Sequence, residues 1–176
     1  PKGDDRRNKA RRFGLRAVDA SGLGVPRKTL LGLPWRIALA MIEKGWVLRA
    51  SIVWQRRNAQ PEPTAKDRPW RTFEFVFLFS KSPKYFFQRT ALGDEEDIWR
   101  IPIQINSSNG LHSAAFPSAL AEKCIKCGTK ENDEVLDPFA GSGTTISTAL
   151  KCGRRAVGVD LKQEYCDYMV QHFRAL

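Results

Sequence analysis

Two acidic residues and the glycine-rich turn between them are the part of this sequence best suited to chemistry. Asp137 ends a short apolar run at residues 135–136, and Asp160 ends a second run at residues 156–159. The turn PFAGSG follows Asp137, and its glycines allow a tight bend and a close approach of a ligand. Asp160 lies 23 residues after Asp137, near the ~20-residue spacing expected of an acid that binds a ribose.

These residues must be positioned by a strand, a turn, a helix and a second strand. The two apolar runs are typical of buried strands in a parallel sheet. Residues 144–151 predict a helix of small residues that Gly153 ends. Parallel sheets bind ligands at the carboxyl ends of their strands, and a helix N-terminus offers free N–H groups to an anion. The unit therefore predicts a ligand site at residues 137–145.

The turn lacks the patterns of two common nucleotide sites. Ile146 stands where the dinucleotide pattern G-x-G-x-x-G requires its third glycine, and the phosphate loop G-x-x-x-x-G-K-[ST] is absent. No lysine or arginine lies in the turn to meet a phosphate. Its acid, aromatic ring and hydroxyl groups instead suit a ligand with an ammonium group, a carboxylate and a ribose.

Composition restricts the class of protein. The chain has 176 residues, enough for one domain with a core. Hydrophobic residues make up 42%, no apolar run approaches the ~18 residues of a membrane span, and no secretory signal is present. The net charge of +10 and pI of about 9.8 favour a polyanionic partner, against the alternative of a cationic surface kept for solubility. We expect a cytoplasmic protein without a membrane partner.

Two cysteines, Cys124 and Cys127, have the C-x-x-C spacing of a metal site. They fall on one face of a predicted helix at residues 118–127, where such spacing more often places small side chains in a core. Cys152 and Cys166 are far apart and form no second pair. We therefore predict no metal site, and free thiols fit a reducing cytoplasm.

Two basic stretches are candidates for contact with nucleic acid. Residues 1–26 hold the run RRNKARR, which predicts a mobile basic arm or a solvated tail. Residues 55–69 hold three prolines and no hydrophobic period, which predicts a polar loop. Its cations are candidate phosphate contacts, unless the loop is only a solvated surface: Arg56, Arg57, Lys66 and Arg68.

The rest of the chain alternates helical and extended patterns. Residues 72–80 are strongly aromatic and predict a buried strand, with residues 85–87 as its short partner in a hairpin. An acidic cluster at residues 94–97 is expected to face solvent. The remaining predictions are helices at residues 30–44, 118–127 and 163–173, a strand at residues 46–54, and irregular chain at residues 99–110.

Four segments together resemble the beta-class DNA amino-methyltransferases, in the order in which that class has them. They are LLGLPWRIALAMIEKGWVLRASIVWQ, DRPWRTFEFVFLFSKSPKYFF, HSAAFP and VLDPFAGSGTT, and they cover nearly the whole chain from Lys28. The resemblance implies an α/β fold of the Rossmann-like, S-adenosylmethionine-dependent methyltransferase type. Its sheet would have seven strands, mostly parallel and twisted, with an antiparallel hairpin at one edge, and would be incomplete at the N-terminus.

The resemblance also implies a division of the chain. Residues 1–27 would be a basic arm or a remnant of an upstream region, and residues 28–176 a single methyltransferase domain. Within that domain, residues 28–88 would form the catalytic side, residues 89–111 a short recognition insert and residues 112–176 the cofactor half.

The same resemblance assigns residue roles. Phe116 of HSAAFP would lie against the cofactor, Asp160 would hold the ribose hydroxyls, and Glu74 matches the acidic position of the family's hairpin motif. The implied cofactor is S-adenosyl-L-methionine. The residues expected to bind it are His112, Ser113, Phe116, Pro117, Asp137, Pro138, Phe139, Gly141, Ser142, Gly143, Thr144, Thr145 and Asp160.

The implied reaction is methylation of an exocyclic amino group in double-stranded DNA, with the target base flipped out of the duplex. A restriction–modification role and a prokaryotic, phage or plasmid origin go with it, and N4 of cytosine is slightly favoured over N6 of adenine. An unrelated nucleotide-dependent oxidoreductase is disfavoured by the glycine pattern.

One departure from the family leaves the catalytic residues unassigned. The family's catalytic motif is Ser, Asp or Asn followed by Pro-Pro and an aromatic residue, and this chain has no Pro-Pro. The motif would lie upstream of Pro1, on another chain, or be lost. In the last case the chain is a non-catalytic or complementing subunit that binds S-adenosylmethionine and nucleic acid. A homodimer and a partner subunit both stay open.

Overall fold

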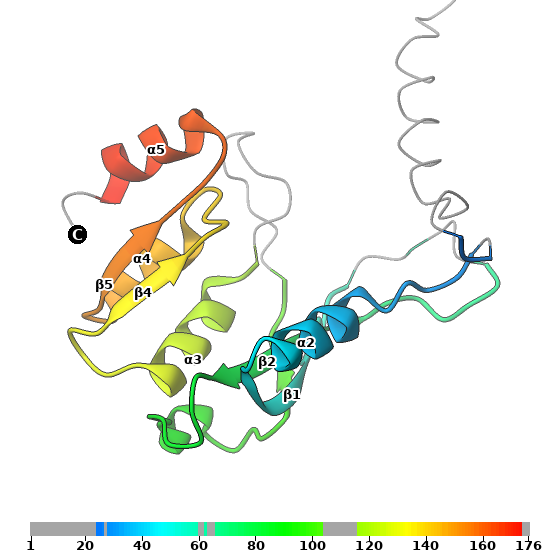
Figure 1. Ribbon diagram of the computed structural model, residues 1–176. Coiled ribbons are helices and arrows are strands. Elements are labelled where there is room, and N and C mark those ends of the chain that lie inside the picture. The colour runs from blue at the N-terminus through cyan, green and yellow to red at the C-terminus, as the bar shows by residue number, and fades with distance from the viewer. Residues whose placement is uncertain (1–23, 27, 60–61, 63–65, 104–115, 174–176) are drawn as a thin grey trace, which may run out of the picture. The chain divides into compact units, whose positions relative to one another are not determined.

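The computed structural model describes residues 24–26, 28–59, 62, 66–103 and 116–173 (Figure 1). The chain divides into two compact units, Pro1–Ala40 and Met41–Leu176, and each is described by itself. Helix α2, Leu33–Glu43, begins in the first unit and ends in the second. The predicted helix at residues 30–44 is therefore confirmed with shorter bounds.

Three strands form the first sheet, in the order β2-β1-β3. Strand β1, Val47–Gln55, pairs antiparallel with β2, Phe73–Ser80, and both were predicted within a residue of these bounds. The prediction that β2 is buried is wrong, because only Ser80 is buried and the rest of the strand is half-buried or exposed. Strand β3, Ile98–Arg100, pairs parallel with the end of β1. The first sheet is thus mixed, with β1 at its centre.

Two predictions for this region are wrong. Residues 85–87 form no strand, and the hairpin-like partner of β2 is β1 instead. Phe87 packs against the core, and the ring of Phe86 lies 5.2 Å from the Lys130 ammonium group. These aromatic residues therefore serve tertiary packing rather than strand pairing. Residues 99–110 were expected to be irregular, but residues 99 and 100 belong to strand β3.

The alternation along β2 explains its position in the sheet. Its four phenylalanines share one face and form a ladder, with ring centroids 5.4 Å apart for Phe73–Phe75, 5.7 Å for Phe75–Phe77 and 6.2 Å for Phe77–Phe79. Aromatic neighbours of this kind stabilise a strand surface. Val76 belongs to the opposite face and packs against the first core.

The first core lies between this sheet, the short helix η2 (Arg89–Leu92) and helix α3 (Ser118–Gly128). Residues 89–103, predicted to begin a recognition insert, contribute buried side chains to it, and the insert itself stays a prediction. The buried members of this core are Ile52, Trp54, Leu92, Trp99, Ile101, Leu120 and Cys127.

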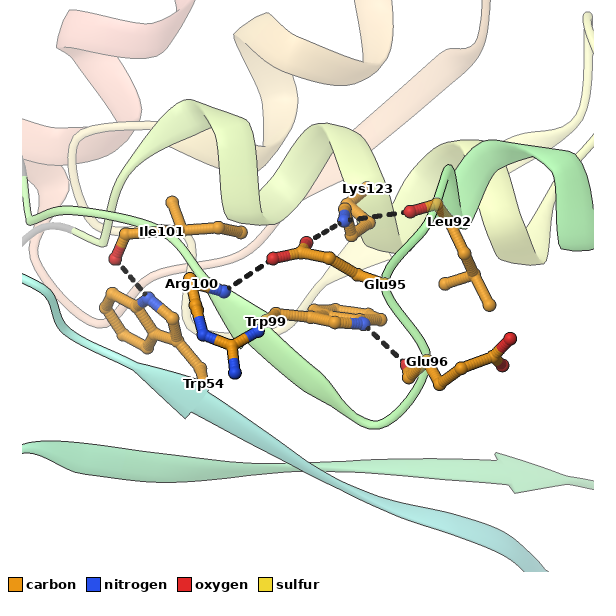
Figure 2. A network of polar contacts seen from close by, with 8 residues as sticks. All are labelled: Trp54, Leu92, Glu95, Glu96, Trp99, Arg100, Ile101 and Lys123. Atoms are coloured by element: carbon orange, nitrogen blue, oxygen red, sulfur yellow. Dashed lines mark hydrogen bonds and ion pairs between the residues drawn. The ribbon is translucent and has the colours of Figure 1, made fainter.

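A polar network fastens the segment after η2 to helix α3 (Figure 2). Lys123 forms an ion pair with Glu95 and donates to the Leu92 carbonyl oxygen at 3.3 Å. Glu95 also accepts the Arg100 N–H at 2.9 Å. Burial acts to raise the pKa of Glu95, but the bonds from Lys123 and Arg100, together with their charges, lower it below its ordinary 4.5. Glu95, expected to face solvent, is therefore partly enclosed.

The predicted strand–turn–helix–strand unit is confirmed. Strands β4 (Glu134–Asp137) and β5 (Arg155–Gly158) pair in parallel and form the second sheet. Helix α4, Thr144–Lys151, connects them, and helix α5, Gln163–Phe173, follows. Both helices have the predicted bounds.

Helix α3 contributes to two cores. Leu120 and Cys127 belong to the first, whereas Ala121 and Ile125 pack with Ala149 of α4 in a second. A third core joins α4 and α5 through Ala140, Ile146 and Met169. No helix among the described residues is long and apolar enough to cross a membrane.

Candidate cofactor site

The two acid-ended strands finish side by side. Asp137 and Gly158 are register partners, and the Val159 N–H donates to the Asp137 carbonyl oxygen at 2.9 Å. The Ala140 N–H then donates to the Val159 carbonyl oxygen at 2.9 Å, which folds the turn back over the end of β5. The carboxyl edge of the parallel pair is where such sheets bind ligands.

Asp137 organises the turn that follows it. Its Oδ1 accepts the Phe139 N–H at 2.9 Å, and its Oδ2 accepts the Thr145 hydroxyl at 2.5 Å. The first bond forms a local turn between the side chain and the backbone two residues on. The second joins the strand end to the first turn of α4. The half-buried Asp137 carboxylate is therefore fixed from two sides.

Asp160 makes a similar pair of bonds with backbone groups. Its Oδ2 accepts the Gly141 N–H at 2.9 Å, and its Oδ1 accepts the Lys162 N–H at 2.9 Å. Asp160 thus joins the glycine turn to the start of α5.

Gly143 shows why the turn needs glycine. It precedes α4 with φ 83° and ψ 30°, a left-handed conformation that costs glycine little. An added Cβ would also lie 2.6 Å from a ring carbon of Phe173 and 2.8 Å from Cγ of Met169. Helix α5 therefore packs directly on the glycine turn, and any side chain at Gly143 would displace it.

Two large apolar side chains are exposed beside the acids. Phe139 is 87% exposed and Leu161, directly after Asp160, is fully exposed. A ligand with a flat apolar part would cover such surface favourably. Sequence reasoning named Phe139 but missed Leu161. The available signal was a large apolar residue placed directly after the acid that ends a strand.

A largely apolar cavity of about 400 Å³ lies next to this site. Strands β2 and β4 contribute Val76 and Val135 to its lining, and Thr145 and Phe116 border it. Phe116 thus lines the same cavity as Thr145, whereas Pro117 is fully buried at the start of α3, and the contact of Phe116 with the cofactor stays a prediction. His112 and Ser113 lie outside the described residues.

Helix α3 presents Cys124 to the same cavity. Cys127 is buried as predicted, but Cys124 is exposed, because its position on α3 faces the cavity rather than the core. Desolvation by the surrounding protein, with a smaller effect of Cys127, raises the pKa of the Cys124 thiol to about 11. The described residues contain no group of three His, Cys, Asp or Glu side chains placed to hold a metal ion.

The predicted phosphate contacts differ in how they are held. Arg56 forms an ion pair with Glu74 at 3.4 Å and donates to the Arg71 carbonyl oxygen, so it joins the two ends of the loop. Arg68 pairs with Glu62 at 2.8 Å. Arg57 and Lys66 are exposed. The DNA-binding role of all four stays a prediction.

Comparison with known proteins gives concordant matches. Residues 3–171 match the N6/N4 methyltransferase family, described as DNA methylase. The chain is 40% identical to the Type II methyltransferase M.Cfr9I of Citrobacter freundii, over 97% of the chain and 58% of that protein. It thus spans little more than half the length of this relative.

Two solved structures have similar folds. The cytosine-N4-specific PvuII DNA methyltransferase matches with a TM-score of 0.73 and 24% identity, over 85% of this chain and 59% of that one. The M1.HpyAVI–SAM complex matches with a TM-score of 0.65 and 28% identity, over 82% of this chain and 72% of that one. The described α/β fold is therefore that of S-adenosylmethionine-dependent DNA methyltransferases.

Proposed function

This chain belongs to the N6/N4 DNA methylase family, and we propose that it forms the cofactor-binding part of a Type II DNA methyltransferase. The reaction is methylation of an exocyclic amino group of a base in double-stranded DNA. One observation carries the proposal. The two parallel strands end side by side, close to Asp137 and Asp160, and both carboxylates accept hydrogen bonds from the glycine turn that follows Asp137.

The residues present fit S-adenosyl-L-methionine. The Asp160 carboxylate suits the two ribose hydroxyls, and the Asp137 carboxylate suits the ammonium group of the methionine part. Exposed Phe139 and Leu161 supply apolar surface for the ring and the sulfonium side. The glycine turn leaves room for close approach. When bound, this cofactor supplies an electrophilic methyl group.

The described residues leave room for a larger sheet. Among them, β4 pairs with β5 only, and Val135 of β4 faces the same apolar cavity as Val76 of β2. We infer that the complete protein has a continuous, mostly parallel seven-stranded sheet, and that a strand outside the described residues fills this cavity. The Pro-Pro-aromatic motif, absent here, would come from that part of the protein.

The substrate is DNA on the grounds of charge and family. The chain carries a net charge of +10, as expected for a protein that meets phosphates. The target base must leave the duplex before its amino group can be reached. We favour N4 of cytosine over N6 of adenine, in keeping with the cytosine-N4 specificity of the similar PvuII enzyme.

The test is methyl transfer from labelled S-adenosyl-L-methionine to duplex DNA by the product of the complete reading frame. Digestion of the DNA and mass spectrometry of its nucleosides should show N4-methylcytosine. N6-methyladenine would correct the base, and labelled RNA with unlabelled DNA would correct the substrate. Failure to bind the cofactor would overturn the proposal.

A second candidate function rests on the missing motif. Because this chain holds no Pro-Pro, it would bind S-adenosyl-L-methionine and DNA as a complementing subunit if the complete reading frame also lacks the motif. Cofactor binding without methyl transfer, restored to activity by a partner chain that carries the motif, would favour this second function.

A further inference from the structure

The turn that follows β1 is attached to the beginning of β2 by its first residue. The Arg56 N–H donates to the Thr72 carbonyl oxygen at 2.8 Å, and the Arg56 guanidinium contacts Glu74 and the Arg71 carbonyl oxygen. The Ala59 N–H closes the turn on the Arg56 carbonyl oxygen at 3.1 Å. One side of the turn at residues 56–59 is therefore fixed.

Asn58 attaches the other side of the turn to the chain that leaves β3. The Ile103 N–H donates to Asn58 Oδ1 at 2.7 Å, and Asn58 Nδ2 donates to the Ile103 carbonyl oxygen at 3.0 Å. A side-chain amide offers the same donor and acceptor as a peptide group. Asn58 thus pairs with the N–H and the carbonyl oxygen of Ile103, as the backbone of a neighbouring strand would.

These bonds continue the pairing of β1 with β3 past its last backbone pair, Gln55↔Arg100. Beyond that pair, Trp54 Nε1 donates to the Ile101 carbonyl oxygen at 2.8 Å (Figure 2), and Asn58 then takes both groups of Ile103. Two side chains therefore carry the sheet onward after the β1 backbone has turned away.

Arg57 lies between Arg56 and Asn58, the two residues that attach the turn, and its side chain is exposed. A cation displayed from a fixed turn loses less conformational freedom on binding a phosphate than one on a free loop. The two bonds join the Asn58 side-chain amide to the backbone of Ile103, 45 residues later in the sequence. They therefore determine where Arg57 stands relative to the end of β3.

We propose that Asn58 is a positioning residue for DNA binding, which holds the turn carrying Arg57 against Ile103 so that Arg57 meets a phosphate. This inference rests on the proposed function. Asn58 acts through Arg57 and does not itself touch DNA. Its loss should weaken DNA binding and leave both cofactor binding and the rate at saturating DNA unchanged.

The experiment compares Asn58→Ala, Arg57→Ala and the double variant in the product of the complete reading frame. DNA affinity by fluorescence anisotropy, KM for DNA, kcat, cofactor affinity and Tm are measured. Each single change should raise Kd and KM for DNA about ten-fold, as expected for losing two hydrogen bonds or one phosphate contact. Arg57→Ala should also reduce the slope of log Kd against log salt by about one.

The double variant separates positioning from independent contact. If Asn58 acts through Arg57, the double variant should bind DNA no more weakly than Arg57→Ala alone. The matched control is Lys126→Gln, which removes an exposed ion pair with Glu122 on helix α3 and should change none of these quantities.

Three results would overturn the proposal. They are additive losses in the double variant, a fall in kcat or Tm without weaker DNA binding, and unchanged DNA affinity in Asn58→Ala. Anisotropy needs no methyl transfer, so these outcomes can be read even if the protein methylates nothing. A protein that binds DNA as described but transfers no methyl group would instead contradict the proposed function.

Discussion

Asp160 and Gly141 are joined by a hydrogen bond of 2.9 Å between a carboxylate oxygen and a backbone N–H, across 19 residues of sequence. The acid proposed to bind the ribose therefore also shapes the glycine turn. Because the second oxygen accepts the Lys162 N–H, one side chain fixes the turn and the entry to α5 together. Binding and local structure at this site depend on the same group.

Asp160→Ala should weaken binding of S-adenosyl-L-methionine by ~10- to 100-fold. The substitution removes charge-assisted acceptors, each worth roughly 1.5–3 kcal/mol, from the ligand and from the turn. Asp160→Asn keeps one carbonyl oxygen and should lose less. Isothermal calorimetry on the purified protein measures both affinities.

The control for this change is Asp167→Asn, because Asp167 accepts an exposed bond from Gln163 at 2.9 Å within α5. It should bind the cofactor normally. Unchanged binding in Asp160→Ala would remove Asp160 from the site.

Gly143→Ala should destabilise the fold by about 2–4 kcal/mol, since a left-handed φ and a clash act together. Its Cβ would lie 2.6 Å from a Phe173 ring carbon. Urea unfolding measures the loss, and cofactor affinity should fall with it because α5 is displaced from the turn.

Gly45→Ala is the matched control for the backbone effect. Gly45 has φ 85°, close to that of Gly143, but nothing lies within 4 Å of an added Cβ. It should cost only ~1–2 kcal/mol, the penalty of the left-handed conformation. Equal losses at the two glycines would contradict a direct contact between α5 and the turn.

The unit from β4 to α5 was predictable because its signals are local. Buried parallel strands appear as apolar runs, and small residues followed by Gly153 define a helix and its end. The sequence around Asp137 and Asp160 therefore indicated both the elements and their acidic ends. It did not indicate the hydrogen bond between Asp160 and Gly141, because the position of a turn relative to a strand end depends on the packing of both segments.

The first sheet was harder to predict because strand propensity does not indicate which other strand a segment pairs with. Residues 85–87 are aromatic, but Phe87 packs on a core instead of pairing with β2. Strand β3 has three residues, too few to show an alternating pattern. The bonds from Asn58 to Ile103 span 45 residues and follow from the packing of the whole sheet.

Thr145→Val should weaken cofactor binding about three- to ten-fold through its effect on Asp137. Valine has nearly the same shape as threonine but cannot donate the hydrogen bond to Asp137 Oδ2, which is worth roughly 0.5–1.5 kcal/mol. The freed carboxylate would rotate away from the position fixed by Thr145. Thr145→Ser keeps the hydroxyl and should retain the affinity. A loss of affinity in Thr145→Ser with none in Thr145→Val would show that the methyl group matters instead.

Stability should depend on pH through the Glu95–Lys123 pair. The pKa of Glu95 is lower in the folded protein than its ordinary 4.5. Its ionised form therefore adds stability that is complete above the unfolded pKa and is lost as the pH falls through the folded pKa. Glu95→Gln should be less stable than the parent by ~1 kcal/mol at pH 7, and the difference should shrink as the pH falls below 4.5 and through the folded pKa.

Urea unfolding at a series of pH values from 3 to 8 tests this relationship. Glu122→Gln is the control, because Glu122 also pairs with a lysine, Lys126, but both side chains are about half exposed. An exposed helical pair of this kind contributes little, so this control should follow the parent at every pH. If the gap between Glu95→Gln and the parent widened as the pH fell, Lys123 would not be stabilising the ionised carboxylate, and the attachment of residues 93–100 to α3 would rest on the packing of Trp99 instead.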